Sequence, residues 1–183
     1  MEPSLSVILP VHNAQSTLRS QIDELLDVIP DMSMQFEVVV VDDGSTDMTE
    51  DVALELVREY PQLKFTRREI QGGIDASVGD GLELCDGEIV FVHETGGTVN
   101  VGSLVRLWQL RKDEGLVMAR TDPPKRSLDF SVVKRLNHAM KRSTPAAPVA
   151  QSHGGIQMIR RDAVESIAEE PEEKRRLRFA NLS

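Results

Sequence analysis

Four consecutive valines constrain the fold of this chain more than any other feature. Val38 to Val41 lead directly into Asp42, Asp43 and Gly44. An apolar, β-branched run that is too short for a helix is typical of a strand buried on both faces, as in a parallel sheet. Open α/β sheets bind their ligands where such strands end. Two adjacent carboxylates repel each other, so each needs solvent, a counter-charge or a ligand.

Segments with strand-like and helix-like patterns alternate along the chain. We expect strands at 4–11, 36–41, 63–66, 88–92, 116–119 and 156–159, and helices at 14–29, 46–60, 76–85, 101–114, 128–142 and 161–168. This alternation predicts an α/β fold with a doubly wound, mostly parallel sheet flanked by helices. Asp47 and Glu50 predict a capping box at the second helix. We expect one domain over 1–168 and a charged, exposed C-terminal tail over 169–183.

Composition argues against several classes of function. The chain of 183 residues has a net charge of -9 and only 4% aromatic residues, which disfavours nucleic acid as a partner. Cys85 is the only cysteine; we expect it to be buried, in a protein of a reducing, cytoplasmic compartment. No apolar run approaches the roughly 18 residues that span a bilayer, and the first residues do not have the pattern of a signal peptide.

Two other α/β folds fit the motifs poorly. The first strand ends at residues 10–14 without a glycine, whereas a dinucleotide-binding fold needs Gly-x-Gly-x-x-Gly there. A receiver domain carries its acidic pair on the first strand and an aspartate on a later one, but here a strand precedes Asp42 and the later strand ends at His93. At the level of single residues, Asn13 as a helix N-cap and His12 as a surface turn residue remain open.

Two motifs together closely resemble the nucleotide-binding half of family 2 glycosyltransferases, which have the GT-A fold. They are SVILPVHNA at 6–14 and VVDDGSTD at 40–47. Residues 73–82 and 86–92 fit the same family. Ser131, Asn137 and residues 155–163 resemble the branch that makes polyprenyl-phosphate sugars. The resemblance covers roughly residues 4–167 and implies a GT-A-like sheet in one domain.

The resemblance implies transfer of a sugar, with inversion, from a nucleoside diphosphate donor to a polyprenyl phosphate or another acceptor. Asp43 is the favoured contact to the base or ribose. A phosphate acceptor is already ionised at neutral pH, so the reaction would not need a general base. The alternative is a catalytically inactive relative that keeps this half as a nucleotide-binding or interaction module. The residues implied to bind the nucleotide sugar are Pro10, Val11, His12, Asn13, Asp42, Asp43, Ser45, Gly73 and Asp75.

The expected metal motif is altered in this chain. The family ends its fourth strand in Asp-x-Asp, which implies a divalent metal, Mg²⁺ or Mn²⁺, at the diphosphate. Here the matching residues are His93, Glu94 and Thr95, and hard cations prefer carboxylate oxygens. One alternative is a softer metal bound by His93, Glu94 and His153; the other is no strong metal site.

Further departures concern the phosphates and the acceptor. The glycine-rich segment after the third strand has Gly72 and Ile74 where the family usually carries a basic residue. Residues 151–157 lack the aspartate and arginine of the polyprenyl-phosphate branch, so no catalytic residue is identified. The helix expected at 128–142 has one apolar and one basic face, for which the resemblance implies peripheral membrane contact. A core helix with a solvated basic face is the alternative.

Overall fold

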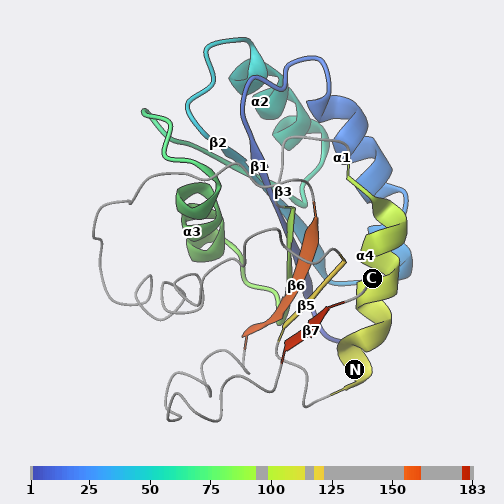
Figure 1. Ribbon diagram of the computed structural model, residues 1–183. Coiled ribbons are helices and arrows are strands. Elements are labelled where there is room, and N and C mark those ends of the chain that lie inside the picture. The colour runs from blue at the N-terminus through green and yellow to red at the C-terminus, as the bar shows by residue number, and fades with distance from the viewer. Residues whose placement is uncertain (1, 94–98, 114–117, 122–154, 162–178, 182–183) are drawn as a thin grey trace.

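The computed structural model describes residues 2–93, 99–113, 118–121, 155–161 and 179–181. Its helices and strands follow the predicted α/β alternation (Figure 1). In chain order they are β1 (Leu5–Val11), α1 (Leu18–Leu26), the short 3₁₀ helix η1 (Ile29–Asp31), β2 (Phe36–Asp42), α2 (Thr49–Glu59), β3 (Leu63–Arg67), α3 (Ile74–Leu84), β4 (Ile89–His93), α4 (Val101–Gln109), η2 (Leu110–Lys112), β5 (Met118–Arg120), β6 (Ile156–Arg160) and β7 (Phe179–Asn181).

One mixed sheet contains all seven of these strands in the order β3-β2-β1-β4-β6-β5-β7. Strands β3, β2, β1 and β4 are parallel to one another. Strand β6 is antiparallel to both β4 and β5, and β7 is parallel to β5. Strand β5 therefore runs in the same direction as β1 to β4, and their carboxyl ends share one edge of the sheet. The predicted, mostly parallel sheet is confirmed, and β6 is its one reversed strand among the described residues.

Helices cover both faces of the sheet, with α3 on one side and α1, α2 and α4 on the other (Figure 1). The side chains of the four valines pack alternately on the two faces of the sheet. Val38 and Val40 belong to the larger core cluster, with Leu18 and Leu107. Val39 and Val41 belong to the smaller cluster beneath α3. All four valines are 0–1% exposed, so the strand predicted to be buried on both faces is confirmed.

The predicted capping box at α2 is wrong. The helix begins at Thr49, and Met48 is its N-cap residue without a side-chain capping bond. The Asp47 carboxylate instead accepts the Thr49 N–H at 3.0 Å, while the Glu50 carboxylate pairs with the Arg67 guanidinium. The long-range ion pair therefore replaces the local contact that a capping box requires.

Part of the expected tail joins the sheet. Residues 179–181 form β7, paired with β5, whereas the sequence pattern had predicted a solvent-exposed tail. A three-residue edge strand has too short a pattern to be recognised locally. The helix expected at 128–142 and most of the one expected at 161–168 lie outside the described residues.

The lone cysteine is buried, as predicted. Cys85 follows α3 and is 2% exposed. Burial raises the pKa of its thiol, against the opposing effect of the nearby Arg161 guanidinium. No helix within the described ranges is long and apolar enough to cross a membrane.

Candidate nucleotide-binding site

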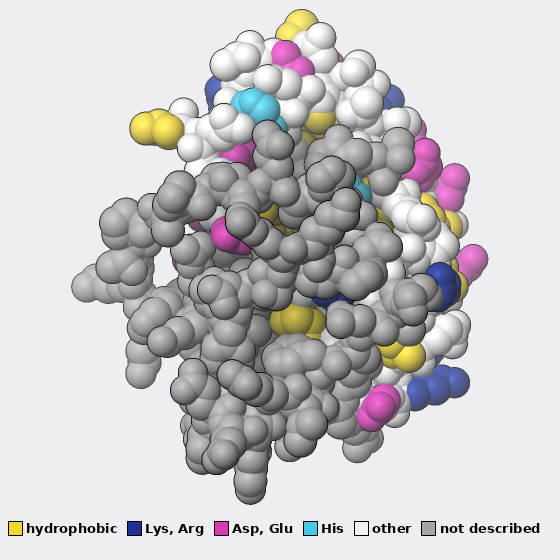
Figure 2. Space-filling view, in the orientation of Figure 1, with side chains coloured by type: hydrophobic (Ala, Val, Ile, Leu, Met, Phe, Trp, Pro, Cys, Tyr) yellow, Lys and Arg dark blue, Asp and Glu magenta, His cyan; other side chains and the backbone are white. Residues whose placement is uncertain are grey.

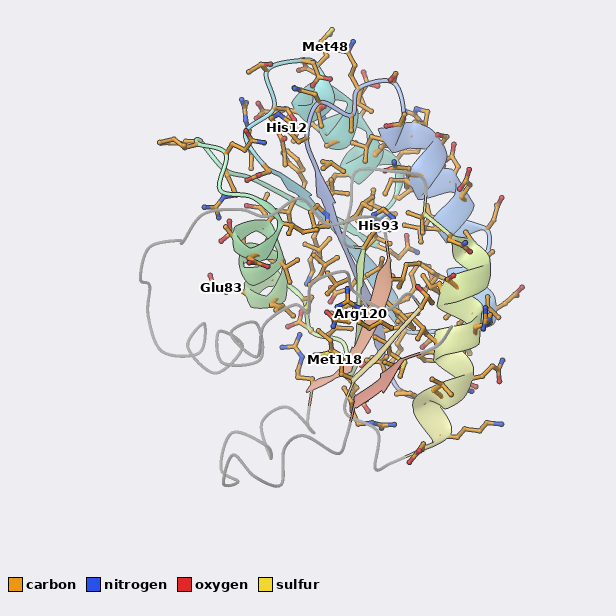
Figure 3. All side chains as sticks on the ribbon, viewed as in Figure 1. His12, Met48, Glu83, His93, Met118 and Arg120 are labelled. Carbon is orange, nitrogen blue, oxygen red and sulfur yellow. The ribbon has the colours of Figure 1, made fainter. Side chains whose placement is uncertain are left out.

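Three loops meet at the carboxyl edge of the sheet. They follow β1, β2 and β3, and together they hold most of the polar residues singled out by the sequence motifs. His12 lies at this end of the molecule, beside the loop that carries Met48 (Figure 3). In the space-filling view a histidine surface reaches solvent in the same place (Figure 2). Hydrogen bonds join the three loops to one another.

Asp42 is buried and stabilises the β2–α2 loop. Its side chain is fully buried, and one carboxylate oxygen accepts the Ser45 N–H at 3.0 Å and also the Ser45 hydroxyl. The Arg67 Nε lies 3.5 Å from the other oxygen. Arg67 also donates to the Ser45 carbonyl at 3.0 Å. A buried charge with these partners stabilises the loop and offers no surface to a nucleoside.

Asp43 holds the β3–α3 loop at its glycine turn. One of its carboxylate oxygens accepts the Gly72 N–H and the other accepts the Gly73 N–H, both at 2.8 Å. The Arg68 Nε lies 3.4 Å from the first oxygen. Gly73 has φ of +79°, a conformation that glycine adopts without strain. Each carboxylate oxygen has more than one acceptor position, so Asp43 can still accept a donor from a ligand.

Gly44 allows the second and third loops to touch. Its φ is +70°, and a Cβ atom at this position would lie 2.9 Å from the backbone nitrogen of Gln71. Only glycine meets both conditions, because other residues rarely adopt this φ and every other residue carries a Cβ. The sequence motif Asp42-Asp43-Gly44 therefore builds the contact between two loops.

Asn13 joins the first loop to the second. Its φ of 51° is the one positive value outside glycine in the described residues, and asparagine tolerates this conformation. The Asn13 N–H donates to the Ser45 hydroxyl at 2.8 Å, and its side-chain oxygen accepts the Thr46 N–H at 2.9 Å. The open alternative of Asn13 as a simple helix N-cap is excluded, since α1 begins at Leu18 with Thr17 as N-cap.

Asp47 adds a second connection between the same loops. Its carboxylate accepts the N–H of Gln15 at 3.2 Å and the N–H and hydroxyl of Thr49. Desolvation works to raise the pKa of Asp47, but these hydrogen bonds, led by that from the Thr49 hydroxyl, leave the pKa below its ordinary value. Asp47 is thus held as an anion at the rim of the site.

The end of β4 carries His93, which is 4% exposed, and this strand lies next to β1. The predicted metal residues Glu94 and Thr95, and His153 of the alternative, lie outside the described residues. Within the described part of the chain, no group of three histidine, cysteine or acidic side chains could hold a metal ion. The described residues therefore do not form a metal site.

Arg120 is a candidate functional residue that the motifs did not reveal. It ends β5 at the same sheet edge, is 9% exposed, and lies opposite Gln157 of β6. Gln157 in turn lies opposite Val92 of β4. The rule that identified Asp42 and Asp43, a charged residue directly after an apolar run, also applies to Arg120, which follows residues 116–119.

The predicted site residues do not all reach the rim. His12 and Asn13 are exposed, and both bond to the second loop. Within the second loop, Ser45 bonds to the first loop and Asp43 to the third. Pro10 and Val11 are buried within β1, although the Val11 carbonyl accepts the Asp43 N–H at 2.8 Å. Asp75 is exposed in the first turn of α3.

A doubly wound sheet with polar loops at its carboxyl edge is the arrangement in which open α/β domains bind their ligands. The model of the family "Glycosyl transferase family 2" matches residues 6–168. The chain therefore belongs to glycosyl transferase family 2.

Individual relatives agree with this assignment. A dolichyl-phosphate beta-glucosyltransferase of Trichomonas vaginalis is 29% identical over 102 residues, which are 53% of this chain and 32% of that protein. A beta-monoglucosyldiacylglycerol synthase of a Nostoc species is 26% identical over 174 residues, 90% of this chain and 37% of that protein. The chain thus spans about a third of the length of these two relatives.

A solved structure shares the fold. It is a mannosyltransferase of Pyrobaculum calidifontis in complex with GDP-Man and Mn²⁺. The likeness has a TM-score of 0.58 at 24% identity and covers 93% of this chain and 48% of that one. This likeness confirms the predicted GT-A-like fold.

Proposed function

We propose that this chain is a glycosyltransferase domain that takes a sugar from a nucleoside diphosphate donor and passes it, with inversion, to an acceptor. The observation that carries the proposal is the bonded rim of three loops at the carboxyl edge, with Asp43 at its centre. Such a rim holds its groups in place before a ligand arrives, which reduces the entropic cost of binding. Membership of the family supplies the class of reaction.

The nucleoside is proposed to lie against the loops after β1, β2 and β3, with Asp43 accepting a hydrogen bond from the base or ribose. Asp42 is buried and braces the loop, so we assign it no direct contact. Gly73, the N-cap of α3, and Asp75, in its first turn, are proposed to lie near the diphosphate. Arg120, at the end of β5, is proposed to face a phosphate group of the donor or the acceptor, because a buried guanidinium is well suited to phosphate.

The acceptor is proposed to be a polyprenyl phosphate or another lipid. The names of the two relatives include dolichyl phosphate and diacylglycerol, which supports a lipid acceptor. A phosphate acceptor would attack as an anion and would need no general base from the protein. Peripheral contact with a membrane follows from such an acceptor and is part of the proposal.

A divalent metal is expected for the family, but the described residues of this chain provide no set of metal ligands. The substitution pair His93→Asp with Thr95→Asp tests this point. Two carboxylates are the ligands that Mg²⁺ and Mn²⁺ prefer, so the double variant should bind a nucleotide sugar more tightly when Mn²⁺ is added. A calorimetric titration unchanged by Mn²⁺ would contradict the assignment of these two positions.

The function itself is tested by turnover. Purified protein is incubated with UDP-glucose or GDP-mannose and a short-chain polyprenyl phosphate, and the lipid product is measured by mass spectrometry. Transfer of the sugar to the lipid supports the proposal, and Arg120→Met should reduce the rate by more than tenfold. Tight donor binding without transfer to any acceptor would favour the alternative, a nucleotide-binding module.

A further inference from the structure

His12 lies between two groups whose hydrogen-bonding roles are fixed. Its Nδ1 is 2.9 Å from the backbone carbonyl oxygen of Asp43, and its Nε2 is 3.1 Å from the side-chain nitrogen of Asn13. A carbonyl oxygen can only accept, so Nδ1 must carry the proton. An amide nitrogen can only donate, so Nε2 must be the bare, accepting nitrogen. Both contacts are satisfied together by the neutral Nδ1–H imidazole alone.

The orientation of Asn13 cannot reverse to suit another form of His12. Its side-chain oxygen accepts the N–H of Thr46 at 2.9 Å, and a backbone N–H can only donate. Turning the amide over would place its NH₂ group against that N–H. The chain of bonds therefore has one consistent direction, from the Thr46 N–H through Asn13 and His12 to the Asp43 carbonyl.

We infer that His12 is a positioning residue, held as the neutral Nδ1–H tautomer, which fixes Asn13 and the Asp43 backbone for the nucleoside. This inference about ligand binding rests on the proposed function. A second proton on His12 would place an N–H against the Asn13 NH₂ group and break that bond. Binding of the donor should therefore weaken as pH falls through the range in which histidine side chains gain a proton, about pH 8 to 5.

The other charged groups around His12 do not account for the expected pH dependence of donor binding. Asp42, Asp43 and Asp47 lie in the loop after β2, and Arg67, Arg68 and Glu69 lie in the loop after β3. Carboxyl and guanidinium groups as classes ordinarily change charge outside this range. The β1–α1 loop has no other ionisable side chain. His93, at the end of β4, is the other described histidine near this edge, and a variant at that position serves as the control.

The first test needs no ligand. Nitrogen-15 NMR of the imidazole distinguishes the two neutral tautomers from each other and from the doubly protonated ring. With the free protein at neutral pH we expect the Nδ1–H form at His12. The Nε2–H form, or a ring that exchanges between tautomers, would overturn the inference even if the protein proves to bind no nucleotide.

The second test is the pH profile of donor binding, measured by calorimetry with UDP-glucose or GDP-mannose between about pH 5.5 and 7.5. These diphosphate diesters have no phosphate group that titrates near neutral pH, unlike free UDP. We expect the wild-type dissociation constant to rise about fivefold on acidification, the effect of one lost hydrogen bond.

Two variants separate the roles of the ring nitrogens. His12→Gln can place an uncharged acceptor near the position of Nε2, so its binding should be independent of pH over this range. His12→Asn can replace only the Nδ1 donor and should bind weakly at every pH. His93→Gln should keep the wild-type pH dependence. An unchanged pH dependence in His12→Gln would overturn the inference, whereas absence of donor binding at every pH would instead overturn the proposed function.

Discussion

At the scale of single residues, the two adjacent aspartates have different roles. Asp42 is fully buried and braces its own loop through Ser45 and Arg67. Asp43 reaches across to the next loop and holds the N–H groups of Gly72 and Gly73. The sequence motif marks both as functional, but it does not show that Asp43 holds glycines 29 and 30 residues away, or that Arg67 lies beside Asp42.

Replacement of Asp43 by asparagine tests its role in holding the glycine turn. An amide offers one accepting oxygen where the carboxylate offers two, so one of the two glycine N–H groups loses its partner. We expect a loss of about 1.5–3 kcal/mol in the free energy of unfolding, the range for hydrogen bonds to charged groups. Donor affinity should fall by more than tenfold. Urea denaturation and calorimetry measure the two effects, and Glu24→Gln, on the exposed face of α1, is the control.

At the scale of elements, α3 shows how closely a helix can approach the sheet. A Cβ atom at Gly81 would lie 2.5 Å from Cγ2 of Ile8 in β1, whereas a Cβ atom at Gly79 would meet nothing within 4 Å. Gly81→Ala should therefore destabilise the protein by about 1–3 kcal/mol through overpacking. Gly79→Ala should stabilise it by about 0.5–1 kcal/mol, because alanine favours a helix. Equal effects of the two changes in thermal denaturation would contradict this packing.

The elements were predictable where local pattern decides them. The strand of four valines, the helices that follow β2 and β3, and the parallel direction of most strands could all be derived from periodicity and from the βαβ rule. The reversal of β6 and the pairing of β7 could not, since a short apolar segment does not specify which edge it joins or in which direction. The same limit applies to Arg120, whose position depends on the place of β5 beside β6.

At the scale of the whole molecule, a cluster of polar groups connects neighbouring strands at the opposite edge of the sheet. This Glu37 cluster consists of Glu37, Ser6, Lys64 and Asp86. The Glu37 carboxylate accepts from the Ser6 hydroxyl at 2.6 Å and from the Asp86 N–H at 2.5 Å. The Lys64 ammonium lies 2.7 Å from it. Burial works to raise the pKa of Glu37, but the hydrogen bonds from Lys64, Ser6 and Asp86 together leave it lowered.

This cluster predicts a loss of stability in acid. Because the folded protein lowers the pKa of Glu37, the stabilisation is present above the ordinary value of 4.5 and is lost as pH falls through the lower, folded value. The free energy of unfolding of the wild-type protein should decrease over that range. That of the Glu37→Gln variant should decrease less. Urea denaturation at a series of pH values checks this, and identical slopes for both proteins would contradict the account.

The loops after β1, β2 and β3 are proposed to bind the nucleoside diphosphate of a sugar donor. Titration of nitrogen-15-labelled protein with UDP-glucose and GDP-mannose, followed by the backbone amide NMR signals, tests this proposal most directly. We predict that one of the two donors shifts the signals of residues 12–15, 43–48 and 68–75 and leaves those of the Glu37 cluster unchanged. Shifts confined to the Glu37 edge, or no shifts with either donor, would contradict the claim.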